Sequence, residues 1–174
     1  LAAGCKAKVV PFSRKSQLDF GAFLKDDRIV IKGETGEVAD ICGKEDLKII
    51  GAHNLENVLA AAAIAYFAGI DAETIGRTIA GFGGVEHRIE FAGEIEGVRY
   101  YNDSKGTNID AAVTALKAIE QNIILIAGGD AKGQDFDEFV EHFRGSVKKM
   151  ILLGRDAHLI QEAADRKGFK DYVF

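Results

Sequence analysis

The first 50 residues carry short hydrophobic runs that alternate with polar positions, as β-strands do. The runs cover residues 8–10, 28–31 and 37–41. The last two flank residues 33–36, which include two glycines, and alternating runs around such a turn predict a β-hairpin. We expect Val30, Val38 and Ile41 to face the core.

After residue 50 the apolar positions recur at the spacing of an α-helix. The first such series is Leu55, Val58, Leu59, Ala62 and Tyr66. Asn54 is expected to cap this helix at its start, and Gly69 to end it. A second helix is predicted over residues 71–81, with Ile75 and Ile79 pointing inward.

Residues 81–84, Gly-Phe-Gly-Gly, form the best linker candidate, and the pattern changes again beyond them. Alternating residues 89–95 and 98–100 predict a second hairpin. Strands and helices then follow in turn: helix 109–119, strand 123–127, helix 136–143, strand 149–153 and helix 157–167. The unbroken apolar run 123–126 predicts a strand buried on both faces.

Strand–helix alternation with short loops predicts a parallel sheet with right-handed crossovers, so the fold class is α/β. We place a domain boundary near residue 84. Residues 1–84 are interpreted as the remainder of a larger domain, and residues 85–174 as an incomplete Rossmann-like domain. Residues 1–4 read as the end of a helix and 171–174 as the start of a strand, which suggests a piece of a longer protein.

Composition and charge exclude several classes of function. The 174 residues are 47% hydrophobic and 28% charged, as in a globular protein, and the net charge is -5. This acidic balance argues against nucleic-acid binding, and no apolar run approaches a membrane span or a signal peptide. Cys5 and Cys42 lack metal-ligand spacing, so we expect free thiols and no metal site.

The first candidate site is the polar loop 102–108, which lies just before a predicted helix. Free backbone N–H groups at a helix start favour an anion, Lys105 adds positive charge, and Thr107 adds a hydroxyl donor. Taken alone, the loop is better explained by a capping role, with Asn108 as the N-cap.

The second candidate is the loop 128–133, which has three glycines and Lys132. Glycine lets the backbone approach a ligand closely, and Lys132 could hold a carboxylate or a phosphate. The chain contains no G-x-x-x-x-G-K-[ST] motif. A flexible strand-to-helix turn explains the glycines equally well.

A third cluster lies around the linker. Asn54 and Asn57 share one helix face and could contact an adenine edge, while Arg88 suits a phosphate. His53 and His87 accompany them. The alternative is a helix cap, structural histidines and a solvated arginine.

In their order and spacing, these segments resemble motifs of the Mur ligases. Residues 51–61 resemble G-x-H-N-x-x-N-x-x-A-A, and residues 87–90 resemble H-R-x-E. Residues 127–133 resemble the next loop of the D-glutamate-adding member of that family. Residues 102–108 resemble N-D-S-K-A-T-N, which marks the D-glutamate-adding branch of that family. Gly106 stands where the family usually has alanine, and we expect this to loosen the loop.

The resemblance implies a fold and site residues. Residues 1–84 would be the C-terminal part of a central ATP-binding domain, and residues 85–174 the amino-acid-binding domain. ATP would be bound by Asn54, Asn57, His87, Arg88 and Asp103. Lys105 and Asp103 would be catalytic, and Thr107 and Lys132 would hold D-glutamate.

The implied enzyme is a cytoplasmic, monomeric ligase of peptidoglycan synthesis, and hence of the cell wall, cell shape and cell division. It would use ATP and Mg²⁺ to join UDP-N-acetylmuramoyl-L-alanine to D-glutamate through an acyl phosphate. The resemblance places the phosphate-binding loop and the Mg²⁺ ligands before Leu1, so the 174 residues alone should be inactive. The alternatives are a sister ligase, such as a folylpolyglutamate synthase, and a non-catalytic nucleotide-binding module.

Overall fold

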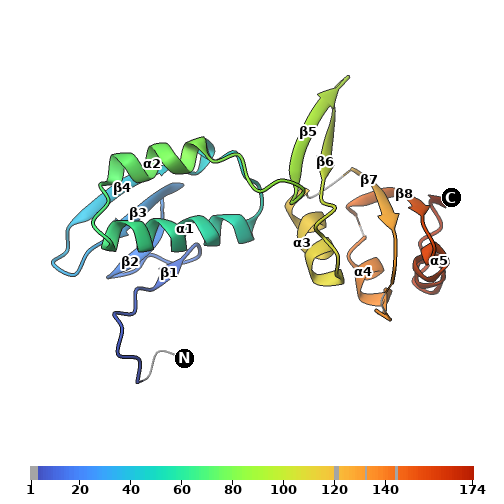
Figure 1. Ribbon diagram of the computed structural model, residues 1–174, viewed down its shortest axis with the longest axis horizontal. Helices are drawn as coiled ribbons and strands as arrows, with labels where there is room; N and C mark the ends of the chain where they lie inside the picture. Colours follow the sequence, from blue (N-terminus) through green and yellow to red (C-terminus); the bar gives the residue numbers. More distant parts are fainter. Residues whose placement is uncertain (1–3, 120–121, 132, 144) are drawn as a thin grey trace. The chain divides into compact units, whose positions relative to one another are not determined.

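The computed structural model describes residues 4–119, 122–131, 133–143 and 145–174 (Figure 1). The chain forms two compact units, Leu1–Gly84 and Val85–Phe174. The assignment of these units to an ATP-binding and an amino-acid-binding domain stays a prediction. The helix end predicted at the N-terminus falls largely on residues 1–3, which lie outside the described residues.

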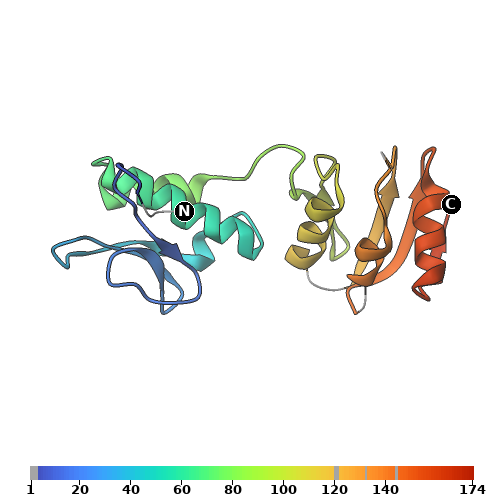
Figure 2. The same cartoon turned by 90° about the horizontal axis from the view of Figure 1, so that it is seen from below.

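The first unit is a four-stranded sheet with two helices on one face (Figure 2). β1 and β2 are parallel, and the other neighbouring pairs are antiparallel. The strands lie in the order β1 (Phe12–Ser13), β2 (Gly21–Lys25), β3 (Arg28–Lys32) and β4 (Val38–Gly43), followed by the short 3-10 helix η1 (Lys44–Asp46) and the helices α1 (Ala52–Phe67) and α2 (Ala72–Gly81). Aliphatic side chains fill the space between sheet and helices, which confirms the predicted hairpin and both helices.

Two expectations for the strands of this unit are wrong. Residues 8–10 are not in a strand: the first pairing with β2 is made by the Pro11 carbonyl, which accepts from Ala22 N at 3.1 Å, and β1 starts only after it. Proline has no N–H to donate, which delays the ladder. Val38 is 59% exposed, because it lies beside Lys32 on the sheet face away from the helices.

The boundaries of α1 and α2 follow local capping rules. The Asp71 carboxylate accepts from Thr74 N at 2.8 Å and caps α2. Gly69 follows the end of α1 with φ +94°, a conformation that costs glycine nothing. Gly69 was predicted as the end of α1, and the start of α2 was predicted at residue 71 without assigning Asp71 as its cap.

The second unit combines an antiparallel hairpin with a three-stranded parallel sheet. The hairpin projects from the rest of the unit in Figure 1. The elements of the second unit are, in chain order, β5 (Glu90–Ile95), β6 (Val98–Asn102), α3 (Ile109–Ile119), β7 (Ile123–Gly128), α4 (Asp137–Glu141), β8 (Val147–Leu153), α5 (Ala157–Arg166) and β9 (Tyr172–Val173). This order confirms the α/β fold class and the predicted alternation, although α4 is shorter than expected.

The parallel sheet is covered on one face only, contrary to expectation. One cluster of buried side chains joins α3, α4 and α5 to Met150 and Leu152 of β8. On the other face, Ile124 is 60% and Ile126 65% exposed. An unbroken apolar run therefore did not mean burial on both faces in the residues that the structure describes.

The hairpin before loop 102–108 agrees with the sequence. β5 and β6 are antiparallel, which confirms the second predicted hairpin, and they form a sheet separate from the parallel one. The loop that follows must therefore be located from its own contacts. No helix of the described part of the chain has the length and hydropathy of a membrane span.

Candidate functional site

Two of the motif segments meet within the second unit. The Asp103 carboxylate accepts from Ile89 N at 3.0 Å, and Lys105 N donates to the His87 carbonyl at 3.0 Å. The Asn102 amide nitrogen lies 3.1 Å from His87 Nδ1. Segment 87–89 and loop 102–108 are therefore held together by backbone and side-chain bonds.

The backbone around Arg88 is strained on both sides. His87 has φ +65° and Ile89 φ +45°, and the left-handed region is particularly unfavourable for a β-branched residue. Such conformations cost on the order of 1–3 kcal/mol each and persist only where other contacts impose them. The bonds from Asp103 and Lys105 supply those contacts and fix the segment that carries Arg88.

Carboxylates also surround the His87 imidazole. His87 N donates to Glu90 Oε2 at 2.8 Å, and the same oxygen lies 3.5 Å from His87 Nδ1. Glu86 Oε1 lies 3.7 Å from Nε2. Both ring nitrogens therefore have polar neighbours within the protein, which orients the ring toward loop 102–108.

Loop 102–108 is tight, which corrects the expectation for Gly106. A Cβ at this position would lie 2.4 Å from Asp103 Oδ2 and 3.0 Å from its carbonyl oxygen. Gly106 N donates to that carbonyl at 2.8 Å. Glycine thus lets the Asp103 carboxylate close over the loop rather than loosening it.

The same loop caps α3 and leaves two polar side chains accessible. Asn108 Oδ1 accepts from Ala111 N at 2.8 Å, so the capping role of Asn108 is confirmed. Lys105 and Thr107 are exposed. Among the described residues no carboxylate lies within ion-pair distance of Lys105 or of Arg88, so both cations are available to an anionic ligand.

Gln134 joins the glycine loop to this site. Its Oε1 accepts from Ile109 N at 3.1 Å, at the first residue of α3. Gln134 N in turn donates to the Ala131 carbonyl at 2.9 Å. Sequence reasoning missed Gln134, because no local pattern pairs it with a helix 25 residues earlier. Lys132, predicted to bind D-glutamate, lies outside the described residues.

A second hydrogen bond connects the glycine loop 128–133 to the segment that follows β8. Asp156 Oδ2 accepts from Ala131 N at 2.9 Å. This backbone hydrogen bond is the main cause that holds the pKa of Asp156 below its ordinary value. The loops that follow β6, β7 and β8 are thus linked at one end of the second unit.

The two asparagines predicted to contact adenine lie on α1 in the first unit. Asn54 is not the cap: α1 begins after Gly51, and the Asn54 side chain donates to the Ile50 carbonyl at 2.8 Å. Gly51, at φ +95°, takes the position that Asn54 was expected to fill. Asn57 is exposed one turn later.

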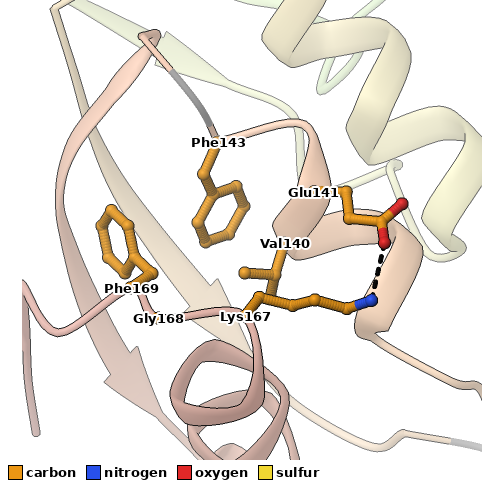
Figure 3. A pocket seen from close by; sticks show the side chains of 6 residues that line it. All are labelled: Val140, Glu141, Phe143, Lys167, Gly168 and Phe169. Carbon is orange, nitrogen blue, oxygen red and sulfur yellow. Dashed lines mark hydrogen bonds and ion pairs between the residues drawn. The ribbon is translucent and has the colours of Figure 1, made fainter.

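A hollow of about 450 Å³ lies elsewhere in the second unit (Figure 3). It is lined by Val140, Glu141, Phe143, Lys167, Gly168 and Phe169. Lys167 Nζ and Glu141 Oε1 form an ion pair at 2.6 Å and so satisfy each other. None of the predicted site residues lines this hollow, and it forms no part of the candidate site.

Comparison with known proteins bears on what these loops do. The family model described as "Mur ligase, glutamate ligase domain" matches residues 87–174. The UDP-N-acetylmuramoylalanine--D-glutamate ligase of Thermoanaerobacter sp. (strain X514) is 51% identical over 168 residues, which are 95% of this chain and 36% of that protein. The ligase of the same name from Pelotomaculum thermopropionicum is 44% identical over 174 residues, 100% of this chain and 38% of that protein. The chain thus spans 36–38% of the length of these curated relatives.

Solved structures show the same fold at low sequence identity. UDP-N-acetylmuramate-alanine ligase MurC from Thermotoga maritima matches with a TM-score of 0.65 and 16% identity, covering 94% of this chain and 39% of that one. Folylpolyglutamate synthase from the same organism matches with a TM-score of 0.55 and 18% identity, covering 84% and 35%. At these identities the likeness concerns the fold alone.

Proposed function

The chain belongs to the Mur ligase family, and on this premise we propose that the full-length protein joins D-glutamate to UDP-N-acetylmuramoyl-L-alanine in the cytoplasm, at the expense of ATP. The observation that carries the proposal is the sequence identity to relatives named as D-glutamate ligases. The products would be the amide, ADP and inorganic phosphate, in the synthesis of a peptidoglycan precursor.

The proposed reaction brings several negatively charged groups close together. ATP phosphorylates the substrate carboxylate, and the amine of D-glutamate then attacks the acyl phosphate and expels phosphate. Both steps need cations near the transferring group. Arg88 and Lys105 are exposed, and among the described residues neither is paired with a carboxylate, which supports giving them that role.

The position of Asp103 supports a role beside these cations. One of its oxygens holds Ile89 N and so fixes the strained segment on which Arg88 lies. We assign it to the nucleotide side of the site with Arg88 and His87. Asn54 and Asn57 would contribute polar groups to the base. The Asn54 side chain uses its amide nitrogen to donate to the Ile50 carbonyl, so its Oδ1 is the atom that would face the base.

The D-glutamate side would be formed by Thr107 and Lys132. D-glutamate has two carboxylates, which suit a cation beside hydroxyl and N–H donors, because charge-assisted hydrogen bonds are the strongest available. Gln134 links the loops that carry these two residues. In the described part of the chain, no group of three or more His, Cys, Asp or Glu could hold a metal ion, so we assign Mg²⁺ to no residue here.

An amino-acid panel tests the substrate assignment. The full-length protein is incubated with MgATP, UDP-N-acetylmuramoyl-L-alanine and one amino acid at a time, and products are identified by mass. We expect product with D-glutamate and none with L-glutamate, L-alanine or D-alanine. Product with another amino acid would favour a sister ligase, and absence of any product would favour a non-catalytic module.

A further inference from the structure

The loops after β7 and β8 pack backbone against backbone. A Cβ at Gly154 would lie 2.9 Å from Gly129 N, and one at Gly128 only 1.6 Å from the Leu153 carbonyl oxygen. Asp156 N donates to the Gly129 carbonyl at 3.2 Å. This close approach needs glycine, and it brings Asp156 within reach of the glycine loop.

The Asp156 carboxylate fixes the loop next to a proposed ligand-binding residue. Its Oδ2 accepts from the N–H of Ala131, a residue that is 5% exposed and directly precedes Lys132. The Asp156 side chain is itself only 20% exposed. An ionised acceptor in a partly buried position makes a stronger bond than a neutral one.

Arg155 connects two carboxylates around the same loop. Its Nη2 lies 2.9 Å from Asp130 Oδ2, and its Nε lies 3.4 Å from Asp156 Oδ1. Without this guanidinium, two negative charges would flank the loop. A ligand that carries two carboxylates, as D-glutamate does, would be repelled by them.

We infer that Arg155 and Asp156 are positioning residues for D-glutamate: Asp156 anchors the glycine loop at Ala131, and Arg155 offsets the charge of Asp130 and Asp156. This inference rests on the proposed function. Neither residue needs to touch the substrate. Arg155 is 73% exposed, so water screens its contribution and the expected effects are moderate.

The charge role is tested by kinetics of the full-length enzyme. Arg155→Ala should raise the KM for D-glutamate roughly three- to tenfold and leave the KM for ATP unchanged. Arg155→Lys should restore most of the loss. Adding Asp130→Asn to Arg155→Ala should also lower the KM for D-glutamate again, because it removes one negative charge beside the loop. The charge role would be overturned if Arg155→Ala raised the KM for ATP as much as the KM for D-glutamate. It would also be overturned if neither Arg155→Lys nor the added Asp130→Asn restored the KM for D-glutamate.

The anchoring role is tested by two changes at one position. Asp156→Asn keeps an oxygen that can accept from Ala131 N, whereas Asp156→Ala removes it. We expect faster hydrogen exchange at the Ala131 amide and a raised KM for D-glutamate in Asp156→Ala, and clearly smaller changes of both in Asp156→Asn, whose neutral oxygen is a weaker acceptor. Unchanged exchange in Asp156→Ala would contradict the anchor, whatever the activity.

The wild-type enzyme separates this inference from the proposed function. If wild-type enzyme forms product with D-glutamate but the variants behave unlike these expectations, only the positioning roles fail. If it forms no product with D-glutamate, the proposed function fails and the inference fails with it.

Discussion

At the scale of single residues, Asp103 combines a structural contact with a proposed chemical role. Its carboxylate holds Ile89 N and lies over Gly106, where a Cβ would meet it at 2.4 Å. The strain at His87 and Ile89 would be released if this contact were lost. The two roles are separable, because asparagine can replace the acceptor but not the charge.

We expect Asp103→Ala to lower the free energy of unfolding by about 1 kcal/mol, as for one lost hydrogen bond, and Asp103→Asn to preserve it. Urea unfolding followed by circular dichroism measures this, since the chain has no tryptophan. In the full-length enzyme both variants should lose most of kcat/KM for ATP. Full activity of Asp103→Asn would show that the charge of Asp103 is not needed.

Lys132 is one of the two residues that we propose to hold D-glutamate. In the full-length enzyme, Lys132→Ala should weaken D-glutamate binding by about 1.5–3 kcal/mol, the contribution of a charged hydrogen bond, and should affect ATP much less. Separate titrations of the two ligands by calorimetry test this. Equal losses for both ligands would contradict the assignment.

The residue contacts also show what the sequence could and could not predict. Asn108 as a cap and the motif loops were accessible, because they depend on neighbours a few positions away. The bonds of Gln134 to Ile109 and of Asp156 to Ala131 each join positions 25 residues apart. No periodicity or local motif specifies such pairs, so they became visible only in the fold.

At the scale of elements, Asp71 at the start of α2 gives a pH-dependent contribution. The pKa of Asp71 lies below its ordinary value of 3.8, chiefly because the carboxylate accepts from the Thr74 backbone N–H. A lowered folded-state pKa means that the stabilisation is complete above the ordinary value and is lost as the pH falls through the folded value.

We therefore expect Asp71→Ala to lower the melting temperature at pH 7, by an amount that shrinks as the pH falls below 3.8. Asp71→Ser, which keeps a capping oxygen without the charge, is the matched control and should show a smaller loss. Thermal unfolding across this pH range is the measurement. A deficit in Asp71→Ala that grows on acidification would exclude the cap as its source.

The one-sided sheet of the second unit makes a prediction at the same scale. Ile126 is 65% exposed on the open face, and Leu152 is 1% exposed against the helices. Ile126→Ala should change the free energy of unfolding by less than about 0.5 kcal/mol. Leu152→Ala should cost about 2–5 kcal/mol, because it leaves a cavity. Similar costs at the two positions, measured by urea unfolding, would mean that both faces are covered.

Hydrophobic patterning could predict β7 but not which of its faces is covered. Residues 123–126 are all apolar, and period-2 alternation, the signal that distinguishes one face from the other, is absent from such a run. Which face packs is decided by α3, α4 and α5, whose buried side chains gather on one side. The tertiary arrangement therefore supplied what the local pattern lacked.

At the scale of the whole molecule, the proposed groups lie on two compact units. Asn54 and Asn57 lie in the first unit, and Arg88, Asp103, Lys105 and Thr107 lie in the second. The 174 residues also contain no G-x-x-x-x-G-K-[ST] loop, and we expect no ligase activity from them alone.

Release of inorganic phosphate by the full-length protein tests the central claim most directly. The protein is supplied with MgATP and UDP-N-acetylmuramoyl-L-alanine, with D-glutamate either present or withheld, and the 174-residue chain serves as the control. We expect sustained release only from the full-length protein and only with D-glutamate. Release that does not depend on D-glutamate, or no release at all, would contradict the proposed ligase.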